Sequence, residues 1–302
     1  MKRIYVLGSL NCDLTIRAPY LPERGETLKG SDFLMTAGGK GANQAYACAK
    51  LGGTVKMAGA VGKDAFGDML LESLRGVGVD ISCIRSTDKS TGVAVITVIG
   101  GDNRIILSEG ANGVVDEDDV QNLLRDAREG DIFVTQLENP YPVVLYGLRI
   151  SKEKGLYTVF NPAPAREDVL EAIGYADLIL PNRKELRLLS GEEDIDEGCK
   201  HLLEAGAKAV IVTLGENGSL LVTENRQRKI ASVHCGETLD TTGAGDTFCG
   251  ALCARLAEGE MLEKAAHFAS VCSGIAVTRR GAQIAVPTKE EVVALGKIFS
   301  ME

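Results

Sequence analysis

A short segment near the C-terminal third, residues 240–248, combines residue types that suit phosphate chemistry. Gly243 and Gly245 let the backbone approach a ligand closely, and the apolar residues from Phe248 onward recur at helical spacing. Free N–H groups at the start of such a helix attract anions, and Asp246 would stand in its first turn. We expect a base beside a phosphate, although a tight turn before a capped helix gives the same pattern.

A second glycine-rich stretch occupies residues 37–45, with the sequence Ala-Gly-Gly-Lys-Gly-Ala-Asn-Gln-Ala. It is not a P-loop, because Lys40 is followed by Gly41 instead of Ser or Thr and the Gly-x4-Gly-Lys spacing is absent. The glycines would instead bring the backbone close to a small polar ligand. A flexible surface loop is the alternative interpretation.

Polar residues also stand where apolar, strand-like runs end. Ligands of open α/β sheets bind outside the carboxyl ends of the strands, so a cleft is expected along this edge. Each residue taken alone is better explained as a turn or cap residue, and the hypothesis depends on their recurrence. They are Asn11, Asp13, Gln136, Glu138, Asn139, Asn161, Asn182, Glu185, Thr213 and Gly215.

The elements that must position these residues alternate between strand and helix. Residues 4–7 form an apolar run that ends at Gly8, typical of a strand buried on both faces. Right-handed crossovers then place helices on both faces of a mostly parallel sheet. We expect one α/β domain over residues 1–302. The pattern predicts strands at 132–136, 156–160, 177–180 and 209–213, and helices at 116–128, 142–154, 183–189, 262–277 and 289–299.

Two hairpins fall outside this alternation. Residues 93–99 and 104–107 flank a Gly-Gly-Asp-Asn turn at 100–103, and their strands are apolar or nearly so on both faces. Such a pair suggests a small second sheet that covers a site or pairs with a partner. A second hairpin is predicted over residues 219–222 and 229–233.

Composition excludes several classes of function. A net charge of -9 argues against a surface for nucleic acid or an anionic membrane. The eight cysteines form no Cys-x-x-Cys pair and only three histidines are present, which argues against zinc and for reduced, mostly buried thiols. We find no signal peptide or membrane span, so a cytoplasmic protein is expected.

Residues 37–45 and 240–248 match the two signatures of the ribokinase family of carbohydrate kinases (the PfkB family), which the chain resembles over essentially all 302 residues. Residues 8–13, 136–138, 161–166 and 276–283 narrow the resemblance toward members that phosphorylate ribose. It implies a ribokinase-like three-layer α/β/α sandwich with a mostly parallel central sheet. It also implies a small β-sheet lid with strands from about 14–36 and 92–108, and phosphoryl transfer from ATP to the 5-hydroxyl of ribose.

The same resemblance implies roles for individual residues. Asp246 would be the general base, and Gly243, Ala244 and Gly245 would form the anion hole. Ala94, Ile96 and Leu107 would close over the sugar, and the lid would pair between the subunits of a homodimer. The sugar hydroxyls would be bound by Asn11, Asp13, Gly39, Lys40, Asn43 and Glu138.

The nucleotide and ion sites also follow from the resemblance. Asn182 and Glu185 match a motif linked to Mg²⁺ and phosphate, although an acid in the first turn of a helix is the simpler interpretation of Glu185. The nucleotide would further contact Thr213, Gly215, Gly245 and, near the adenine, Ser270. An activating K⁺ would be bound by Asp240 and by carbonyls at Thr242, Ala276, Arg279, Gly281 and Ala285. Some relatives carry Ser at the position of Ala285, which can offer only its carbonyl.

Three alternatives stay open at this stage. An oxidoreductase would need a Gly-x-Gly-x-x-Gly motif after the first strand, and that motif is absent. A non-catalytic sugar sensor would have no need of Asp246 beside anion-binding glycines. A kinase of 2-deoxyribose, a nucleoside, fructose or 2-keto-3-deoxygluconate differs only in its acceptor, and Asp13 bears on this choice because a carboxylate accepts hydrogen bonds from two neighbouring hydroxyls.

Overall fold

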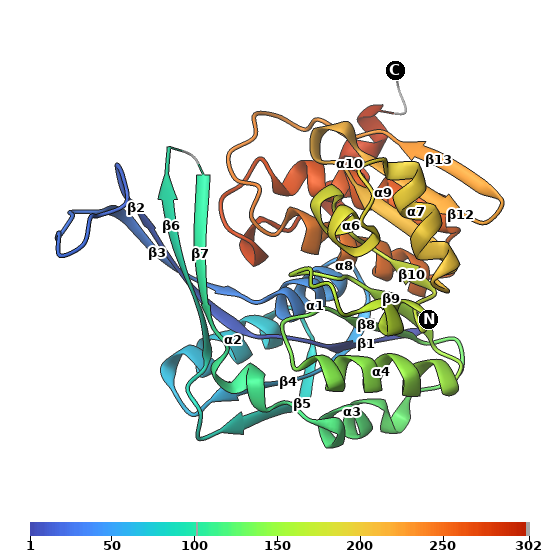
Figure 1. Cartoon of the computed structure of the whole chain (residues 1–302), viewed down its shortest axis with the longest axis horizontal. Coiled ribbons are helices and arrows are strands. Elements are labelled where there is room, and N and C mark those ends of the chain that lie inside the picture. The colour runs from blue at the N-terminus through green and yellow to red at the C-terminus, as the bar shows by residue number, and fades with distance from the viewer. Residues whose placement is uncertain (101, 300–302) are drawn as a thin grey trace.

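A nine-stranded sheet forms the centre of the molecule (Figure 1). The computed structural model describes residues 1–100 and 102–299, so residue 101 of the predicted turn at 100–103 and residues 300–302 of the predicted domain lie outside the described residues. All neighbouring strands are parallel except at the edge formed by β12 and β13. In spatial order the strands are β13 (Arg226–Ile230), β12 (Ser219–Thr223), β11 (Ala209–Thr213), β10 (Leu178–Ile179), β9 (Tyr157–Phe160), β8 (Ile132–Thr135), β1 (Arg3–Leu7), β4 (Thr54–Gly62) and β5 (Asp80–Thr87).

Helices cover both faces of this sheet, which gives the predicted three layers. Successive side chains of β1 point to opposite faces, so that Ile4 and Val6 join one buried apolar cluster while Tyr5 and Leu7 join the other. The first cluster packs under α1 (Lys40–Lys50), α2 (Ala65–Gly76), α8 (Ala244–Ala257), α9 (Leu262–Ala276) and α10 (Lys289–Phe299). The second packs under α3 (Glu117–Leu123), α4 (Tyr141–Glu153), α5 (Leu170–Ile173), α6 (Arg183–Ser190) and α7 (Ile195–Glu204).

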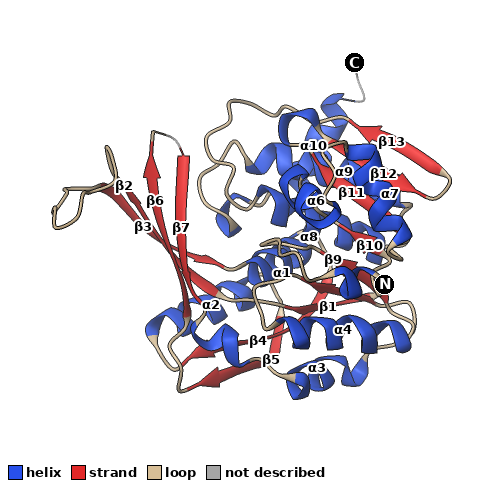
Figure 2. Cartoon of the chain, in the orientation of Figure 1, coloured by secondary structure: helices blue, strands red, loops and turns tan. Residues whose placement is uncertain are grey.

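A second sheet of four strands stands away from this sandwich (Figure 2). Its order is β3 (Ser31–Gly38), β2 (Asn11–Arg17), β6 (Gly92–Ile99) and β7 (Asp102–Ser108). β2 leaves the end of β1 after only three residues, so the first strand of the small sheet begins beside the carboxyl edge of the large one. The small sheet is therefore anchored where the polar residues were predicted to gather.

Two predicted elements differ from the observed ones. The helix expected over 116–128 ends at Leu123 and continues only as a 3₁₀ turn, Leu124–Asp126. The second strand of the later hairpin lies at Arg226–Ile230 instead of 229–233, because Thr223 pairs directly with Arg226 across a tight turn. This edge strand is polar and exposed, so apolar patterning did not locate it. Within residues 1–100 and 102–299, no helix is long and apolar enough to cross a membrane.

Candidate active site

The turn before α8 has the geometry that its glycines predict. Gly243 caps the helix with a left-handed φ of 71°, a conformation that favours glycine. A Cβ at this position would lie 2.8 Å from the Cβ of Ala282, so the space also requires glycine. Ala244 N–H donates to the Thr241 carbonyl at 3.2 Å, and the next N–H groups belong to the helix start, where intrahelical partners are missing. The turn thus presents donors suited to an anion.

Asp246 lies in the first turn of α8 and is only 8% exposed. Its two carboxylate oxygens each accept a hydrogen bond from a side-chain amide of α1: Asn43 donates to Oδ2 at 3.1 Å and Gln44 to Oδ1 at 2.9 Å. Close contact between the helices makes this possible, because a Cβ at Gly250 would lie 2.5 Å from the Cβ of Ala47. The two glycine-rich stretches of the sequence therefore meet at one carboxylate.

Glu138 organises a second group of polar side chains at the end of β1. Its Oε2 accepts hydrogen bonds from the Ser9 hydroxyl at 2.5 Å, the Lys40 backbone N–H at 3.0 Å and the Asn11 amide at 3.4 Å. Asn112 completes the group by donating to the Asn11 side-chain oxygen at 2.8 Å. Asn11 and Glu138, both predicted to bind sugar, are brought together here.

Asp13, two residues beyond Asn11 on β2, is buried to the same extent as Asp246, at 8% exposed. None of the side chains in the described part of the chain donates a hydrogen bond to it. Burial, and after it the charges of Glu138 and Asp246, raise the pKa of Asp13 to about 7. The carboxylate fills the space over Gly38, where a Cβ would lie 2.2 Å from Asp13 Oδ2.

Lys40 links the two groups electrostatically. Burial disfavours its charged form, but Asp246, Glu138, Glu185 and Asp13 together outweigh this and raise the pKa of Lys40. The ammonium is therefore held as the counter-charge of the polar cluster.

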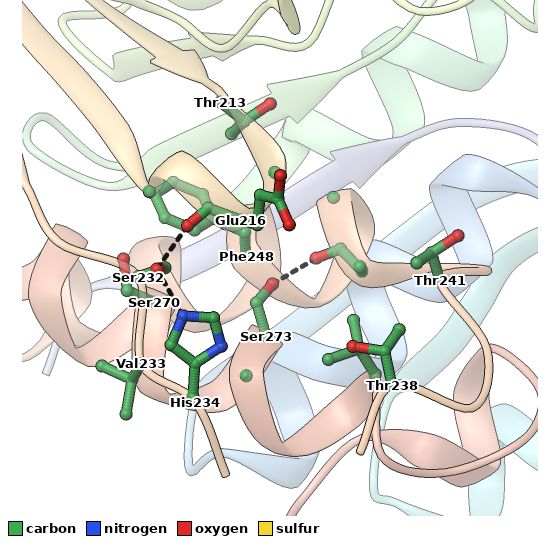
Figure 3. Close-up of a pocket in the computed structure, with 16 residues that line it drawn as sticks. Thr213, Glu216, Ser232, Val233, His234, Thr238, Thr241, Phe248, Ser270 and Ser273 are labelled. Carbon is green, nitrogen blue, oxygen red and sulfur yellow. Dashed lines mark hydrogen bonds between the residues drawn. The ribbon is translucent and has the colours of Figure 1, made fainter. Parts of the chain in front are cut away.

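Two hollows border the turn before α8, and Thr241 lines both. One, of about 440 Å³, opens between the small sheet and the turn and includes Asp13, Ile96 and Asp240. The other, of about 420 Å³, is walled by β11, the segment after β13, α8 and α9 (Figure 3). Four predicted nucleotide residues line the second hollow: Thr213, Gly215, Gly245 and Ser270.

The wall of the second hollow also contains residues that the sequence did not indicate. Figure 3 shows Val233 and His234, from the segment after β13, on the side opposite Thr241. Phe248 of α8 contributes an apolar surface, and Ser273 donates its hydroxyl to the Ala244 carbonyl at 2.5 Å. A mostly apolar wall with a few polar groups is typical of a site for a flat, partly polar ligand.

Asn182 and Glu185 do not line this hollow and form a capping box at the start of α6. The Asn182 side chain accepts from the Glu185 N–H at 2.9 Å, and Glu185 accepts from the Asn182 N–H at 2.7 Å. Burial raises the pKa of Glu185, while the Asn182 N–H and Lys40 oppose this rise and Asp246 adds to it. Glu185 thus caps a helix and also lies within electrostatic reach of Asp246.

The three predicted lid residues share one face of the small sheet with Asp13. Asp13 pairs with Ala94, and Ala94 pairs with Leu107, in a single row across three strands. Ile96 follows two residues beyond Ala94, on the same face, and lines the hollow beside Asp13. Ala94 and Ile96 are buried, whereas Leu107 is 46% exposed.

Asp240 is held at the mouth of the same hollow. Its two oxygens accept the backbone N–H groups of Thr242 and Gly281, each at 2.9 Å. Burial opposes the charged form, but these hydrogen bonds and the charge of Arg17 outweigh it and lower the pKa of Asp240. The end of α9 lies alongside, where the Ala276 carbonyl accepts the Arg279 N–H at 3.0 Å, and Ala285 is buried in a 3₁₀ turn, Gln283–Ala285.

No group of three or more His, Cys, Asp or Glu side chains arranged to hold a metal ion occurs in the part of the chain that the structure describes.

Four polar residues of the site carried no predicted role: Ser9, Gln44, Asn112 and Gln283. Gln283 donates to the Asn43 side-chain oxygen at 3.2 Å and accepts the Ser73 hydroxyl at 2.6 Å. Gln44 and Gln283 stand inside stretches that matched the family, but the match gave no role to them. Asn112 lies in a 3₁₀ turn, Gly110–Val114, with no motif around it.

Comparison with known proteins agrees with this geometry. Residues 1–289 match the family model described as pfkB family carbohydrate kinase. The ribokinase of Schizosaccharomyces pombe is 39% identical, over 97% of each chain. The crystal structure of ribokinase from Thermotoga maritima superimposes with a TM-score of 0.90 at 35% identity, covering 98% of this chain and 100% of the other. The ribokinase of Arabidopsis thaliana, solved with ribose and ATP, gives 0.89 at 30% identity, over 97% and 98%.

Proposed function

The chain belongs to the pfkB family of carbohydrate kinases, and we propose that it transfers the γ-phosphoryl group of ATP to the 5-hydroxyl of D-ribose, giving ribose 5-phosphate. One observation carries the chemistry: Asp246 is held by two amides in the first turn of α8, beside the turn that separates the two hollows. The choice of ribose is supported by the Schizosaccharomyces pombe ribokinase at 39% identity and by the Arabidopsis structure.

The roles of the α8 residues follow from the demands of phosphoryl transfer. Asp246 accepts the proton of the attacking hydroxyl. The N–H groups of Gly243, Ala244 and Gly245 stabilise the charge on the transferred phosphoryl oxygens, because preorganised donors at a helix start need little reorganisation. A base on one side of the turn and an anion site within it suit an in-line reaction between two bound substrates.

Asp13 is the principal ligand of the sugar in this proposal. It is buried and lacks a donor among the described side chains, and sugar hydroxyls would supply the missing hydrogen bonds. Asn11, Asn43, Glu138, Lys40 and the backbone at Gly39 complete the sugar site. Ala94, Ile96 and Leu107 would cover the bound sugar and exclude water, which otherwise competes as a phosphoryl acceptor.

The nucleotide would occupy the hollow of about 420 Å³. Thr213 and Gly215 lie on one wall of it and Ser270 on another, while Gly245 borders the turn that would receive the phosphate. Asn182 does not line this hollow, but a parallel bridge joins it to Thr213, which does. Asn182 and Glu185 would thus act at the phosphate end, in addition to capping α6.

Two ions are part of the proposal. Mg²⁺ supplies charge neutralisation on the phosphates when bound, and the Glu185 carboxylate, with water, offers the hard oxygen ligands that it prefers. A K⁺ ion would be held by Asp240, whose lowered pKa keeps it charged, and by carbonyls of Thr242, Ala276, Arg279, Gly281 and Ala285. This set of ligands suits a monovalent cation because all of them are oxygens and only the Asp240 carboxylate carries a charge.

The outer face of the small sheet supports a homodimer. One cross-strand row on this face runs through Met35, Leu14, Val95 and Ile106, and is apolar across all four strands. Ile106 is 75% exposed and Met35 46%. An exposed apolar face of this kind marks an interaction surface.

The dimer is tested by Ile106→Lys, which places a charge at the β7 end of the apolar row, at its most exposed member. Sedimentation velocity should show a dimer for the parent and a monomer for this variant. Leu188→Lys, at an exposed apolar position on α6 away from the small sheet, is the matched control and should stay dimeric. A monomeric parent, or a dimeric Ile106→Lys, contradicts the proposal.

The thiols are consistent with the cytoplasmic location that we propose. All eight cysteines are free and six of them are buried, as expected in a reducing compartment.

The substrate is tested by measuring ADP release from ATP with D-ribose, 2-deoxyribose, fructose, 2-keto-3-deoxygluconate and a nucleoside, with and without K⁺. We expect kcat/KM to be highest for ribose and the rate to increase with K⁺. Equal values for ribose and 2-deoxyribose would exclude the proposed role of Asp13, and no ADP release with any acceptor would favour a sugar sensor.

A further inference from the structure

Gln44 makes more hydrogen bonds at the centre of the site than its place in the sequence suggested. It is completely buried, at 0% exposed. Its amide nitrogen donates to Asp246 Oδ1 at 2.9 Å and to Asn161 Oδ1 at 3.0 Å. Its oxygen accepts from the Gln136 amide at 2.8 Å and from the Cys249 thiol at 3.4 Å. The side chain therefore uses all four of its hydrogen-bonding positions.

These four partners determine which end of the amide faces Asp246. If the amide were reversed, its oxygen would meet two carbonyl-type oxygens and its nitrogen would meet the Gln136 donor, leaving buried groups unsatisfied. Asn161 is itself held by its donation to the Leu180 carbonyl at 2.7 Å. Gln136 packs against the backbone at Gly8, where a Cβ would lie 2.3 Å from its side-chain oxygen.

The two oxygens of the Asp246 carboxylate therefore have different surroundings. Oδ1 of Asp246 is bonded to a group that lies wholly inside the protein, whereas Oδ2 is bonded to Asn43, which is 8% exposed and was predicted to contact sugar. A general base needs one oxygen aimed at the substrate and a restrained rotamer. The Oδ2 side is therefore the one that faces a residue predicted to contact the sugar.

We propose that Gln44 is a positioning residue for the phosphoryl transfer: it anchors Oδ1 of Asp246 so that Oδ2 is presented to the sugar hydroxyl. Gln136 acts one step further out by holding Gln44 in the required orientation. This proposal rests on the proposed function, because it assigns Gln44 a role relative to Asp246 as base.

The test is Gln44→Met, which keeps the length of the side chain but removes its donors and acceptors. With ribose and ATP we expect kcat to fall about 10- to 100-fold, as misplacement of a catalytic group by about an ångström typically does, while KM for ribose changes by less than about threefold.

Two further variants keep the test decisive. Gln136→Met removes only the bond to the Gln44 oxygen, and should lower kcat in the same direction by about threefold or more. If circular dichroism and ATP binding show that Gln44→Met does not fold, the Gln136→Met variant is used to test the proposal instead. Thr158→Val is the matched control: this hydroxyl is equally buried in the central sheet but bonds to Tyr175 and Asp177, so kcat should be unchanged.

The outcomes separate this proposal from the function on which it rests. A folded Gln44→Met with kcat within about twofold of the parent, or with its loss confined to KM, overturns the positioning role. The same conclusion follows if Gln44→Met fails to fold and Gln136→Met keeps full kcat. If Asp246→Asn also keeps its turnover, the assignment of the base itself is wrong.

Discussion

Asp13 and Asp246 are equally buried, each 8% exposed, yet the chain surrounds them in different ways. Asp246 receives an amide N–H on each oxygen. Asp13 receives none from the described side chains, and its pKa is raised to about 7, first by burial and then by neighbouring carboxylates. One carboxylate is therefore satisfied by the protein before any ligand arrives, whereas the other has hydrogen-bonding capacity left for a ligand.

Burial therefore serves two purposes in one site. A base that must act at a defined atom benefits from preorganisation, since its partners need not rearrange during the reaction. Burial has already removed water from a ligand-binding carboxylate. The ligand therefore binds more tightly when its hydroxyls supply the missing hydrogen bonds. Substitutions at these two carboxylates should therefore have different effects on turnover and on binding.

Removing the charge of Asp246, the proposed base, should have the greatest effect. In Asp246→Asn the acceptor of the hydroxyl proton is lost, and kcat should fall by on the order of 10²-fold or more, as general base catalysis is typically worth. Binding of ATP, measured by calorimetry, should be retained because the nucleotide hollow is unchanged. Near-full turnover would show that Asp246 does not act as base.

Removing the charge at Asp13 should affect binding instead of turnover. In Asp13→Asn the sugar hydroxyls would donate to a neutral amide oxygen instead of a charged carboxylate. Because hydrogen bonds to charged groups are stronger, KM for ribose should rise about 10- to 100-fold with kcat nearly unchanged. A fall in kcat with constant KM would reverse the roles assigned to the two carboxylates. Steady-state kinetics at saturating ATP separates the two results.

The same substitution should stabilise the free protein at alkaline pH. The pKa of Asp13 is about 7 in the folded chain against an ordinary value of 3.8, so the folded state holds a proton that the unfolded state has lost between these pH values. The free energy of unfolding therefore falls as the pH rises through this range and stays lower above it. Asp13→Asn should raise it at pH 8 by up to about 4 kcal/mol, since a tenfold change in acid constant is worth about 1.4 kcal/mol.

Chemical denaturation of parent and variant at pH 4 and pH 8 measures this gain. The advantage of Asp13→Asn should be present at pH 8 and absent at pH 4. An equal effect at both values would mean that the substitution acts through packing instead of charge.

The protonation of Asp13 should also affect the pH dependence of kcat/KM in the parent enzyme, by a smaller amount. Below pH 7 Asp13 becomes protonated and, as the proposed acceptor of sugar hydroxyls, loses strength, so kcat/KM for ribose should fall by up to about fivefold between pH 7 and pH 6. The profile for Asp13→Asn should lack this inflection. An identical inflection in the variant would assign it to another group.

The sequence predicted Asp246 and the turn before it better than the side chains that hold the site residues in place. Asp246 and its glycines are contiguous, and a helix start has a local pattern that can be read directly. The α/β layering followed in the same way from alternating apolar runs, and the structure confirms it. The assignment of roles within the site stays a prediction until the variants are measured.

The supports could not be predicted because they are not local. Gln44, Gln136 and Asn161 come from α1, from the end of β8 and from the end of β9, and they meet only when parallel strands adopt their register. Asn112 reaches Asn11 from a separate 3₁₀ turn. Such contacts depend on tertiary packing, which single-residue patterns do not encode.

The smallest predicted effect concerns the weakest bond to Gln44. The Cys249 thiol donates to the Gln44 oxygen at 3.4 Å, while the Gln136 amide donates to the same oxygen at 2.8 Å. Thiols are weak donors, so Cys249→Ala should leave kcat within about twofold of the parent, although the small cavity should lower the free energy of unfolding by about 1 kcal/mol. Kinetics and thermal denaturation of this variant check both values. A loss of kcat as large as that of Gln136→Met would mean that the base side depends on packing around α8 more than on the amide that holds Asp246.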